Sequence, residues 1–224
     1  MTFNISYNSI SGFIPSFLAN LTNLVTLSLD SNQIGGSIPS SLGNLTNLVT
    51  LSLDSNQIGG SIPSSLGNLT NMVTLSLGSN QISGSIPSSL GNLTNLVTLS
   101  LYLNQINGSI PQEIGNMNNL SELYLNNNEL TGEIPFELGY PQHLEILNLG
   151  YNSLHGRIPN GYLKFSSYTF MGNKDLCGDI EGFPPCLPHN NRSIVHQIKF
   201  LVLGFLLVLA ILGCVFHFQN GQEN

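Results

Sequence analysis

Asp30 and Asp54 are the residues whose type and spacing come nearest to a chemical site. They stand 24 residues apart in a repeated stretch, so in stacked strands their carboxylates would lie about 5 Å from each other. That distance suits a metal site or an acid/base pair. Gly78 takes the next equivalent position, however, and no histidine or third acid joins the two. We therefore interpret the pair as part of a solvated face.

The rest of the sequence also lacks catalytic and metal-binding patterns. It contains no nucleophile motif, phosphate-binding loop or zinc motif. We therefore predict a chain that is not an enzyme and that holds no cofactor or metal. The five histidines are scattered without the spacing of metal ligands: His143, His155, His189, His196 and His217.

Composition narrows the classes of partner. The chain has 224 residues, of which 41% are hydrophobic and only 8% are charged. Five basic residues against twelve acidic ones give a net charge of −7. Because phosphate binding needs clustered lysine and arginine, we predict no nucleic-acid partner.

Seven asparagines recur at a constant spacing of 24 residues. Each stands two places before an aliphatic residue and four places before a glycine, in the pattern NxIxGxIP or NxLxGxIP. A fixed period of this length is typical of a solenoid of stacked coils. We find no further copy of the pattern after Pro159. The seven positions are Asn8, Asn32, Asn56, Asn80, Asn104, Asn128 and Asn152.

One repeat shows what must position these asparagines. The alternation around Leu27 and Leu29 predicts a short strand with one buried face, from which Thr26 and Ser28 point outward. Asn32 ends the strand. When coils stack, its carboxamide can donate to carbonyls and accept from amides of the neighbouring coil. We therefore expect an asparagine ladder along the stack.

The repeat resembles the plant-type leucine-rich repeat, whose consensus is LxxLxLxxNxLxGxIPxxLGxL. The resemblance covers residues 1–161 as seven units of 24 residues. It implies an α/β fold, a right-handed solenoid with a parallel concave sheet and an irregular or 3-10 convex side. Residues 1–8 already form the strand of a repeat, with neither a signal peptide nor a capping module before them. We therefore expect Met1 to be an internal position of a longer parent.

The exposed strand positions are monotonous in the early repeats and varied in the later ones. Residues 21–44 and 45–68 are identical, and their outward columns carry only threonine and serine. The later residues are our candidate ligand face, because rigid aromatic rings bury a large area at small entropy cost. Alternatively, the tyrosines only cover neighbouring aliphatic groups. The candidate ligand face comprises Tyr102, Leu103, Glu122, Tyr124, Asn126, Asn127, Asn148 and Tyr151.

Sequons for N-glycosylation are frequent. Four of them keep the period of the repeat, and copying of one ancestral LTN stretch explains their number equally well. Together they favour the lumen of the secretory pathway over the cytosol. The sequon asparagines are Asn4, Asn20, Asn44, Asn68, Asn92, Asn107, Asn119 and Asn191.

Residues 162–187 are predicted to form a cap. Phe165, Tyr168 and Phe170 are suited to plug the open core of the last coil. The stretch that follows resembles FxGNxxLCG, the segment that closes the ectodomain of plant leucine-rich-repeat receptor kinases. That resemblance implies a disulfide between Cys177 and Cys186. The alternative is two unpaired thiols.

Residues 200–218 are predicted to span a membrane. These 19 residues carry no charge and as a helix would be about 28 Å long; a buried core helix is the alternative. The nearby Arg192 and Lys199 precede the span and no basic residue follows it, which by the positive-inside rule places the repeats in the cytosol. The resemblance and the sequons imply the reverse. We expect a single-pass plasma-membrane protein with extracellular repeats, a linker at 188–199 and a short tail at 219–224.

These observations predict a recognition protein. The resemblance implies the non-catalytic region of a receptor-like kinase, with a peptide or protein ligand, a co-receptor ectodomain and the membrane as partners. A kinase-free receptor-like protein or a hydrolase inhibitor is a second possibility. A third is a structural binder of ice or wall polysaccharide, which would use the threonine and serine columns.

Overall fold

The computed structural model describes residues 1–139 and 143–187. The chain divides into two units, Met1–Pro184 and Pro185–Asn224, and the fold described below is that of the first. Within the described part of the chain, none of the helices has the length and hydropathy that a bilayer span requires. The predicted span at 200–218, the linker at 188–199, the tail at 219–224 and the sequon at Asn191 lie outside the described residues.

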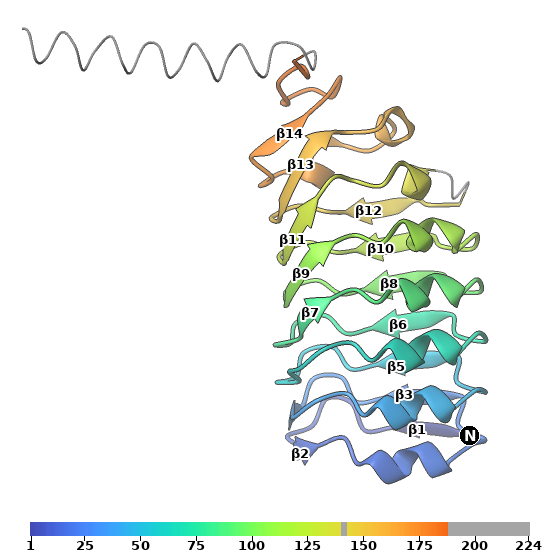
Figure 1. Ribbon diagram of the computed structural model, residues 1–224. Coiled ribbons are helices and arrows are strands. Elements are labelled where there is room, and N and C mark those ends of the chain that lie inside the picture. The colour runs from blue at the N-terminus through green and yellow to red at the C-terminus, as the bar shows by residue number, and fades with distance from the viewer. Residues whose placement is uncertain (140–142, 188–224) are drawn as a thin grey trace, which may run out of the picture. The chain divides into compact units, whose positions relative to one another are not determined.

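The first unit is a stack of coils that each contribute one strand to a seven-stranded parallel sheet (Figure 1). The register advances by 24 residues at each step, so that Leu27 faces Leu51 and Leu51 faces Leu75. This sheet is called the main sheet below. It confirms the predicted parallel-sheet solenoid. Its order is β1 (Thr2–Asn4), β3 (Thr26–Ser28), β5 (Thr50–Ser52), β6 (Thr74–Ser76), β8 (Thr98–Ser100), β10 (Glu122–Tyr124) and β12 (Ile146–Asn148).

A second row of short parallel strands follows the recurring asparagines other than Asn56, as one sheet of five strands and one sheet of two. Sequence analysis predicted the 3-10 elements that are described below, but it did not predict these strands. The NxIxGxIP stretches are extended, and the amide of Gln57 donates to the carbonyl of Ile34 in the preceding coil at 2.8 Å. Backbone groups that stacking removes from water are thus paired. The strands are β2 (Ser11–Phe13), β4 (Gln33–Gly35), β7 (Ser83–Ser85), β9 (Gln105–Ser109), β11 (Glu129–Gly132), β13 (Ser153–Arg157) and β14 (Asp175–Cys177).

Short 3-10 helices begin after the prolines and return the chain to the main sheet. In six of the first seven the helix starts directly after a proline in extended conformation, as at Pro63 with φ −66°. No α-helix occurs among the described residues. The helices are η1 (Ser16–Asn20), η2 (Ser40–Asn44), η3 (Ser64–Asn68), η4 (Ser88–Asn92), η5 (Gln112–Asn116), η6 (Phe136–Gly139), η7 (Asn160–Tyr162) and η8 (Ser167–Phe170).

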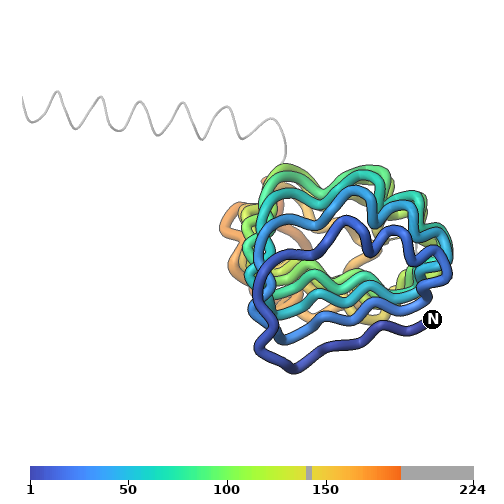
Figure 2. The backbone as a smooth tube through the Cα atoms, turned by 90° about the horizontal axis from the view of Figure 1, so that it is seen from below, coloured from blue at the N-terminus to red at the C-terminus, as the bar shows by residue number. Residues whose placement is uncertain are grey.

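A glycine in each of the helices η2 to η5 sets how closely the coils stack. A Cβ atom on Gly67 would lie 2.3 Å from the carbonyl oxygen of Ser89, and one on Gly43 would lie 2.5 Å from that of Ser65. No other residue type fits so close to a neighbouring backbone. Seen along the stack, successive coils therefore overlie one another with little offset (Figure 2).

The asparagine ladder runs along the inside of the stack. The Nδ2 of Asn56 donates to the carbonyls of Leu29 and Leu53, and its Oδ1 accepts from the amide of Ile34, all at 3.0–3.1 Å. The same pattern recurs at Asn32, Asn80, Asn104, Asn128 and Asn152. At the end of the stack, Asn8 donates only within its own coil, to Ile5 and Ser6.

The ladder has an eighth rung that the sequence pattern did not reveal. Asn173 is buried. Its Oδ1 accepts from the amide of Leu154, and its Nδ2 donates to the carbonyls of Leu149 and Phe170. Sequence analysis ended the pattern after Pro159, because Asn173 follows Asn152 by 21 residues and not by 24. The cap therefore continues the bonding of the repeats.

The aromatic plug of the cap differs in one member from the prediction. Phe170 is fully buried and Phe165 is partly buried, as expected, but Tyr168 is about 75% exposed. Tyr162 takes its place in the core and stacks edge-on to Phe170, with ring centroids 6.3 Å apart. The Tyr162 hydroxyl donates to the carbonyl of Pro135 at 2.7 Å, which satisfies the polar end of a buried ring.

Candidate ligand-binding face

The main sheet presents four columns of residues on the side away from the core. Two columns lie on the strands and two lie in the turn that follows each strand. The first strand column carries threonine in five successive coils and then Glu122 and Ile146. The second column carries Asn4, serine in four coils, and then Tyr124 and Asn148. The structure thus brings the members of the candidate ligand face together over β8, β10 and β12.

Asp30 and Asp54 lie side by side on this surface but are not simply solvated, so that interpretation was wrong. The Asp30 carboxylate accepts hydrogen bonds from the Ser6 hydroxyl at 3.1 Å, from the amide of Asp54 at 3.0 Å and from the Ser52 hydroxyl. The Asp54 carboxylate accepts from the amide of Gly78. Both carboxylates therefore organise the backbone of the next coil.

Burial changes the acidity of Asp54. Loss of hydration is the main reason why its pKa rises to about 6; the Gly78 amide opposes the rise and the charge of Asp30 adds to it. The pair has no further acid or histidine beside it, and the described residues contain no cluster of three potential metal ligands. The site can therefore hold negative charge that varies with pH.

Tyr102 owes its position to Gly78. A Cβ atom on Gly78 would lie 2.3 Å from Cε1 of Tyr102, so the ring lies directly over the glycine backbone. Burial and the charges of Asp54 and Asp30 raise the pKa of the Tyr102 hydroxyl. One side of the ring thus covers the previous coil, as the alternative interpretation proposed, and the residue as a whole stays half-exposed.

Glu122 and Tyr124 share strand β10 and interact with each other. Burial, the charge of Glu122 and a hydrogen bond to its carboxylate raise the pKa of Tyr124. The Glu122 carboxylate also lies 3.5 Å from the hydroxyl of Thr98 in the preceding coil. Ile146, about 42% exposed, follows Glu122 in the same column. Sequence reasoning missed Ile146, although its alignment with Thr26 identifies it.

The turn after each strand presents a further column in an unusual backbone conformation. Its residues precede the ladder asparagines and all have φ between 50° and 58°, although none is glycine. Leu103 has φ 50° with its side chain about 48% exposed, and Tyr151 has φ 55° and is about 57% exposed. A positive φ is unfavourable for a bulky residue. Exposed apolar side chains are thus held here at a cost in backbone energy.

Polar side chains complete the candidate ligand face. Asn126 donates from Nδ2 to Oδ1 of Asn127 at 2.8 Å, and Oδ1 of Asn148 accepts from the amide of Gly150 at 3.2 Å. The Tyr151 hydroxyl lies 3.7 Å from Sδ of Met171 in the cap. Among the described residues, an ion pair joins Arg157 to Asp179. The carboxylate of Glu122 therefore has no cation opposite it in the described structure.

The seven described sequon asparagines are exposed. Asn119 differs from the others in the repeats, since its Nδ2 donates to the carbonyl of Thr94 at 3.1 Å. It belongs to a second row of asparagines, missed by sequence reasoning, in which Asn47, Asn71 and Asn95 make the same bond at 2.9 Å. Their spacing of 24 residues was the available signal.

In the cap, Cys177 and Cys186 are both disulfide-bonded.

Comparison with known proteins places this geometry in context. A family model described as leucine-rich repeat region matches residues 4–161. A search among curated proteins finds no match. Among solved structures, the ectodomain of the Arabidopsis thaliana receptor kinase GASSHO1/SCHENGEN3, crystallised with CASPARIAN STRIP INTEGRITY FACTOR 2, is 36% identical with a TM-score of 0.79. That match covers 83% of this chain and 22% of the ectodomain.

Two further structures are similar. The Arabidopsis receptor kinase HAESA, solved with the peptide hormone IDA and the co-receptor SERK1, is 39% identical with a TM-score of 0.77, and the match covers 81% of this chain and 30% of HAESA. A plant ice-binding protein is 28% identical with a TM-score of 0.61, over 83% of this chain and 67% of that protein. The chain therefore spans less than a third of the length of the two receptor ectodomains.

Proposed function

Because this chain belongs to the plant-type leucine-rich-repeat family, whose matched members include receptor kinase ectodomains, we propose that it is the non-catalytic recognition region of a membrane receptor. The observation that carries this proposal is the change along the main sheet. The strands of four coils present repeated threonine and serine; the turn after the fourth of these strands presents Tyr102, and the next strand presents Glu122 and Tyr124. A surface that only has to pack and stay soluble has no need of that change.

The ligand is a peptide or a protein segment that crosses the candidate ligand face. HAESA was solved with a peptide hormone and a co-receptor, and the likeness of fold supports the same kinds of partner here. Tyr102 and Tyr124 would serve as anchors, since each ring is already held on one side and loses little freedom on binding. Asn126, Asn127 and Asn148 would bond the backbone of the ligand.

Membrane attachment is part of the proposal. Residues 200–218 would anchor the chain, with the repeats outside the cell and their sequons in the secretory pathway. Cys177 and Cys186 would pair with each other and close the cap. Any phosphorylation would belong to a kinase domain of the parent protein.

The test begins with the full chain in detergent micelles and a pool of peptides extracted from plant tissue. Bound peptides are identified by mass spectrometry, synthesised and titrated by calorimetry. We expect the double variant Tyr102→Ala/Tyr124→Ala to raise Kd at least about tenfold. The matched control, Thr26→Ala/Thr50→Ala in the early coils, should change Kd less than about twofold. Equal effects of the two doubles, or no bound peptide, would count against the proposed face.

Ice binding is a second candidate, favoured by the likeness to a plant ice-binding protein. The threonine column and the serine column of β3, β5, β6 and β8 pair in exact register, which makes a regular array of hydroxyl groups. An ice-recrystallisation assay of the full chain tests this candidate. Activity that disappears in Thr50→Arg/Thr74→Arg would support it, and inactivity of the unchanged chain would reject it.

A further inference from the structure

A long groove runs along the stack between the second row of strands and the 3-10 helices. Its two sections have volumes of about 1080 Å³ and 890 Å³, and they share Ser64, Ser85 and Pro87, so they are continuous. The groove extends from the coil of Pro39 to the coil of Pro159. It does not include any member of the candidate ligand face.

The repeat itself creates the groove. The strands of the second row end at or shortly before an Ile-Pro pair, and the next helix begins after the proline, as between Ser85 and Ser88. Only the Ile-Pro pair lies between them. The isoleucines are buried and the prolines are half-exposed, and the carbonyl of Pro87 is bonded by the amide of Leu90. The floor is therefore apolar, and its proline carbonyls are already paired.

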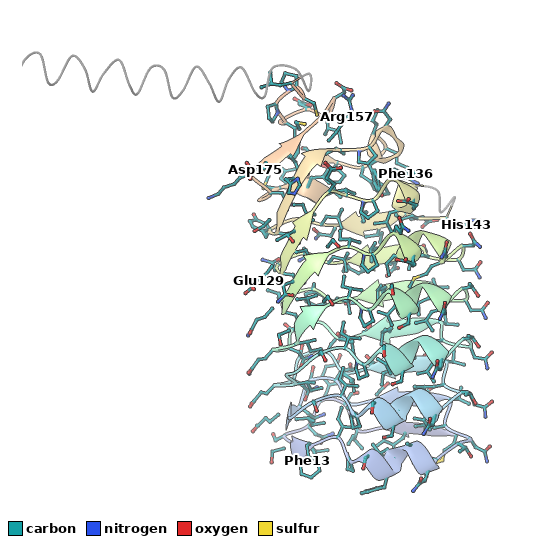
Figure 3. All side chains as sticks on the ribbon, viewed as in Figure 1. Phe13, Glu129, Phe136, His143, Arg157 and Asp175 are labelled. Atoms are coloured by element: carbon teal, nitrogen blue, oxygen red, sulfur yellow. The ribbon has the colours of Figure 1, made fainter. Side chains whose placement is uncertain are left out.

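The walls change character along the groove. In the coils of Pro39 and Pro63 they carry serine hydroxyls. Towards the cap the corresponding positions carry Glu113, Glu133 and Glu137. Phe136, about 60% exposed, adds an aromatic ring at the same end, and Figure 3 shows it beside the cap end of the stack. One end of the groove is thus strongly acidic.

The charge of this end is not neutralised within the described residues. Arg157 also lines the groove, but its guanidinium is engaged by Asp179. Glu113 is held by the coil of Pro111, and Glu133 and Glu137 flank Pro135 in the next coil, so their repulsion is fixed by the fold. A ligand that brings positive charge would relieve it, and it would do so over an apolar floor where the local dielectric constant is lower than in water.

We propose that this groove binds an extended cationic polypeptide segment, with its apolar side on the Ile-Pro floor and its basic side chains at Glu113, Glu133 and Glu137. Six coils at about 4.8 Å span roughly 25 Å. An extended chain that advances about 3.1 Å per residue fills that length with about eight residues. The site is separate from the candidate ligand face and goes beyond the proposed function.

The experiment uses the full chain in micelles and a fluorescein-labelled peptide of about ten alternating proline and lysine residues. Fluorescence anisotropy measures binding. We expect the triple variant Glu113→Gln/Glu133→Gln/Glu137→Gln to weaken binding at least about tenfold. The matched control removes the same charge from exposed glutamates outside the groove: Glu129→Gln/Glu145→Gln/Glu181→Gln. In Figure 3, Glu129 lies on the other side of the stack from Phe136. This control should change Kd less than about twofold.

Three further measurements make the outcome decisive. Ser88→Arg places a positive charge in the wall, and we expect it to weaken binding of the lysine peptide while circular dichroism shows an intact fold. A peptide of alternating proline and glutamate should bind at least about tenfold more weakly than the lysine peptide. Equal weakening by the two triple variants, or no weakening by the groove triple, would overturn the proposal. Tyr102→Ala/Tyr124→Ala should leave binding of the lysine peptide unchanged. A failure of the groove proposal can therefore be told apart from a failure of the proposed function.

Discussion

The side-chain oxygen of Asn173 accepts a hydrogen bond from the backbone amide of Leu154 at 2.9 Å. This bond joins the cap to the last repeat in the same way as each repeat is joined to the one before it. It is a buried bond, so water cannot replace it when it is lost. The cap is therefore held by the ladder as well as by its aromatic plug.

Replacing Asn173 by alanine should loosen the cap. The variant leaves the amide of Leu154 and the carbonyls of Leu149 and Phe170 without their partner, so we expect a loss of about 2 kcal/mol or more in unfolding free energy. Urea denaturation measures the loss, and hydrogen exchange at Leu154 locates it. Asn8→Ala is the control, because Asn8 is exposed at the open end; we expect it to cost less than about 1 kcal/mol. Similar costs for both variants would argue against a buried eighth rung.

Replacing Gly67 by alanine should disturb the stacking of the 3-10 helices. The new Cβ would meet the carbonyl oxygen of Ser89 at 2.3 Å, and rigid backbone on both sides cannot move apart without cost. We expect a loss of about 2 kcal/mol, within the range for overpacked cores. The measurement is the midpoint of urea unfolding.

Gly59→Ala is the matched control in the same coil. Its Cβ would have its nearest neighbour, the carbonyl oxygen of Gln81, at 3.7 Å, which is an ordinary contact. We expect a change of less than about 0.5 kcal/mol. If Gly59→Ala were as harmful as Gly67→Ala, the loss of glycine itself would be the cause, and close stacking would not.

The periodicity of the sequence predicted the structural features that recur every 24 residues. Leu27 and Asn32 could be placed on the core and on the ladder because one physical requirement, burial between two neighbouring coils, recurs at each of their copies. The second row of strands escaped prediction because the glycine and serine of NxIxGxIP carry no strand propensity. Pairing with the next coil, a tertiary effect, makes that stretch extended.

Features that occur once escaped prediction for a different reason. Tyr162 and Tyr168 are both aromatic residues of the cap, and the buried Tyr162 is the one whose hydroxyl reaches the Pro135 carbonyl of the preceding coil. The burial of Asp54 depends on Gly78 in the next coil and on the ring of Tyr102 one coil further on. Neither relationship leaves a local pattern in the sequence.

Asp54 should make stability depend on pH. Burial raises its pKa to about 6 in the folded state, above the ordinary value of 3.8, so between these values the folded state binds more protons than the unfolded state. The contribution of Asp54 to the free energy of unfolding therefore falls as pH rises from about 4 to 6, and it stays low above pH 6. Asp54→Asn keeps an acceptor for the amide of Gly78 and removes the charge. We expect it to raise Tm at pH 7, on the order of 2 °C after allowance for solvent screening, and to have little effect at pH 4.

The control for pH is Ser55→Ala, an exposed and uncharged neighbour. Its effect on Tm should be the same at both pH values in scanning calorimetry. A benefit of Asp54→Asn that is as large at pH 4 as at pH 7 would show that the folded state does not hold a carboxyl group of raised pKa at this position.

Leu103 should lower the stability of the fold while its exposed side chain contacts the ligand. Its φ of 50° is unfavourable for leucine but suits asparagine, so Leu103→Asn should stabilise the chain by about 0.5–1 kcal/mol in urea denaturation. The reverse exchange one coil later, Asn127→Leu, should destabilise it, since Asn127 also loses the bond from Asn126. If Leu103 is kept for its exposed side chain, Leu103→Asn should also raise the Kd of a bound peptide several-fold. A stabilised variant with unchanged Kd would remove Leu103 from the candidate ligand face and leave the tyrosines as its anchors.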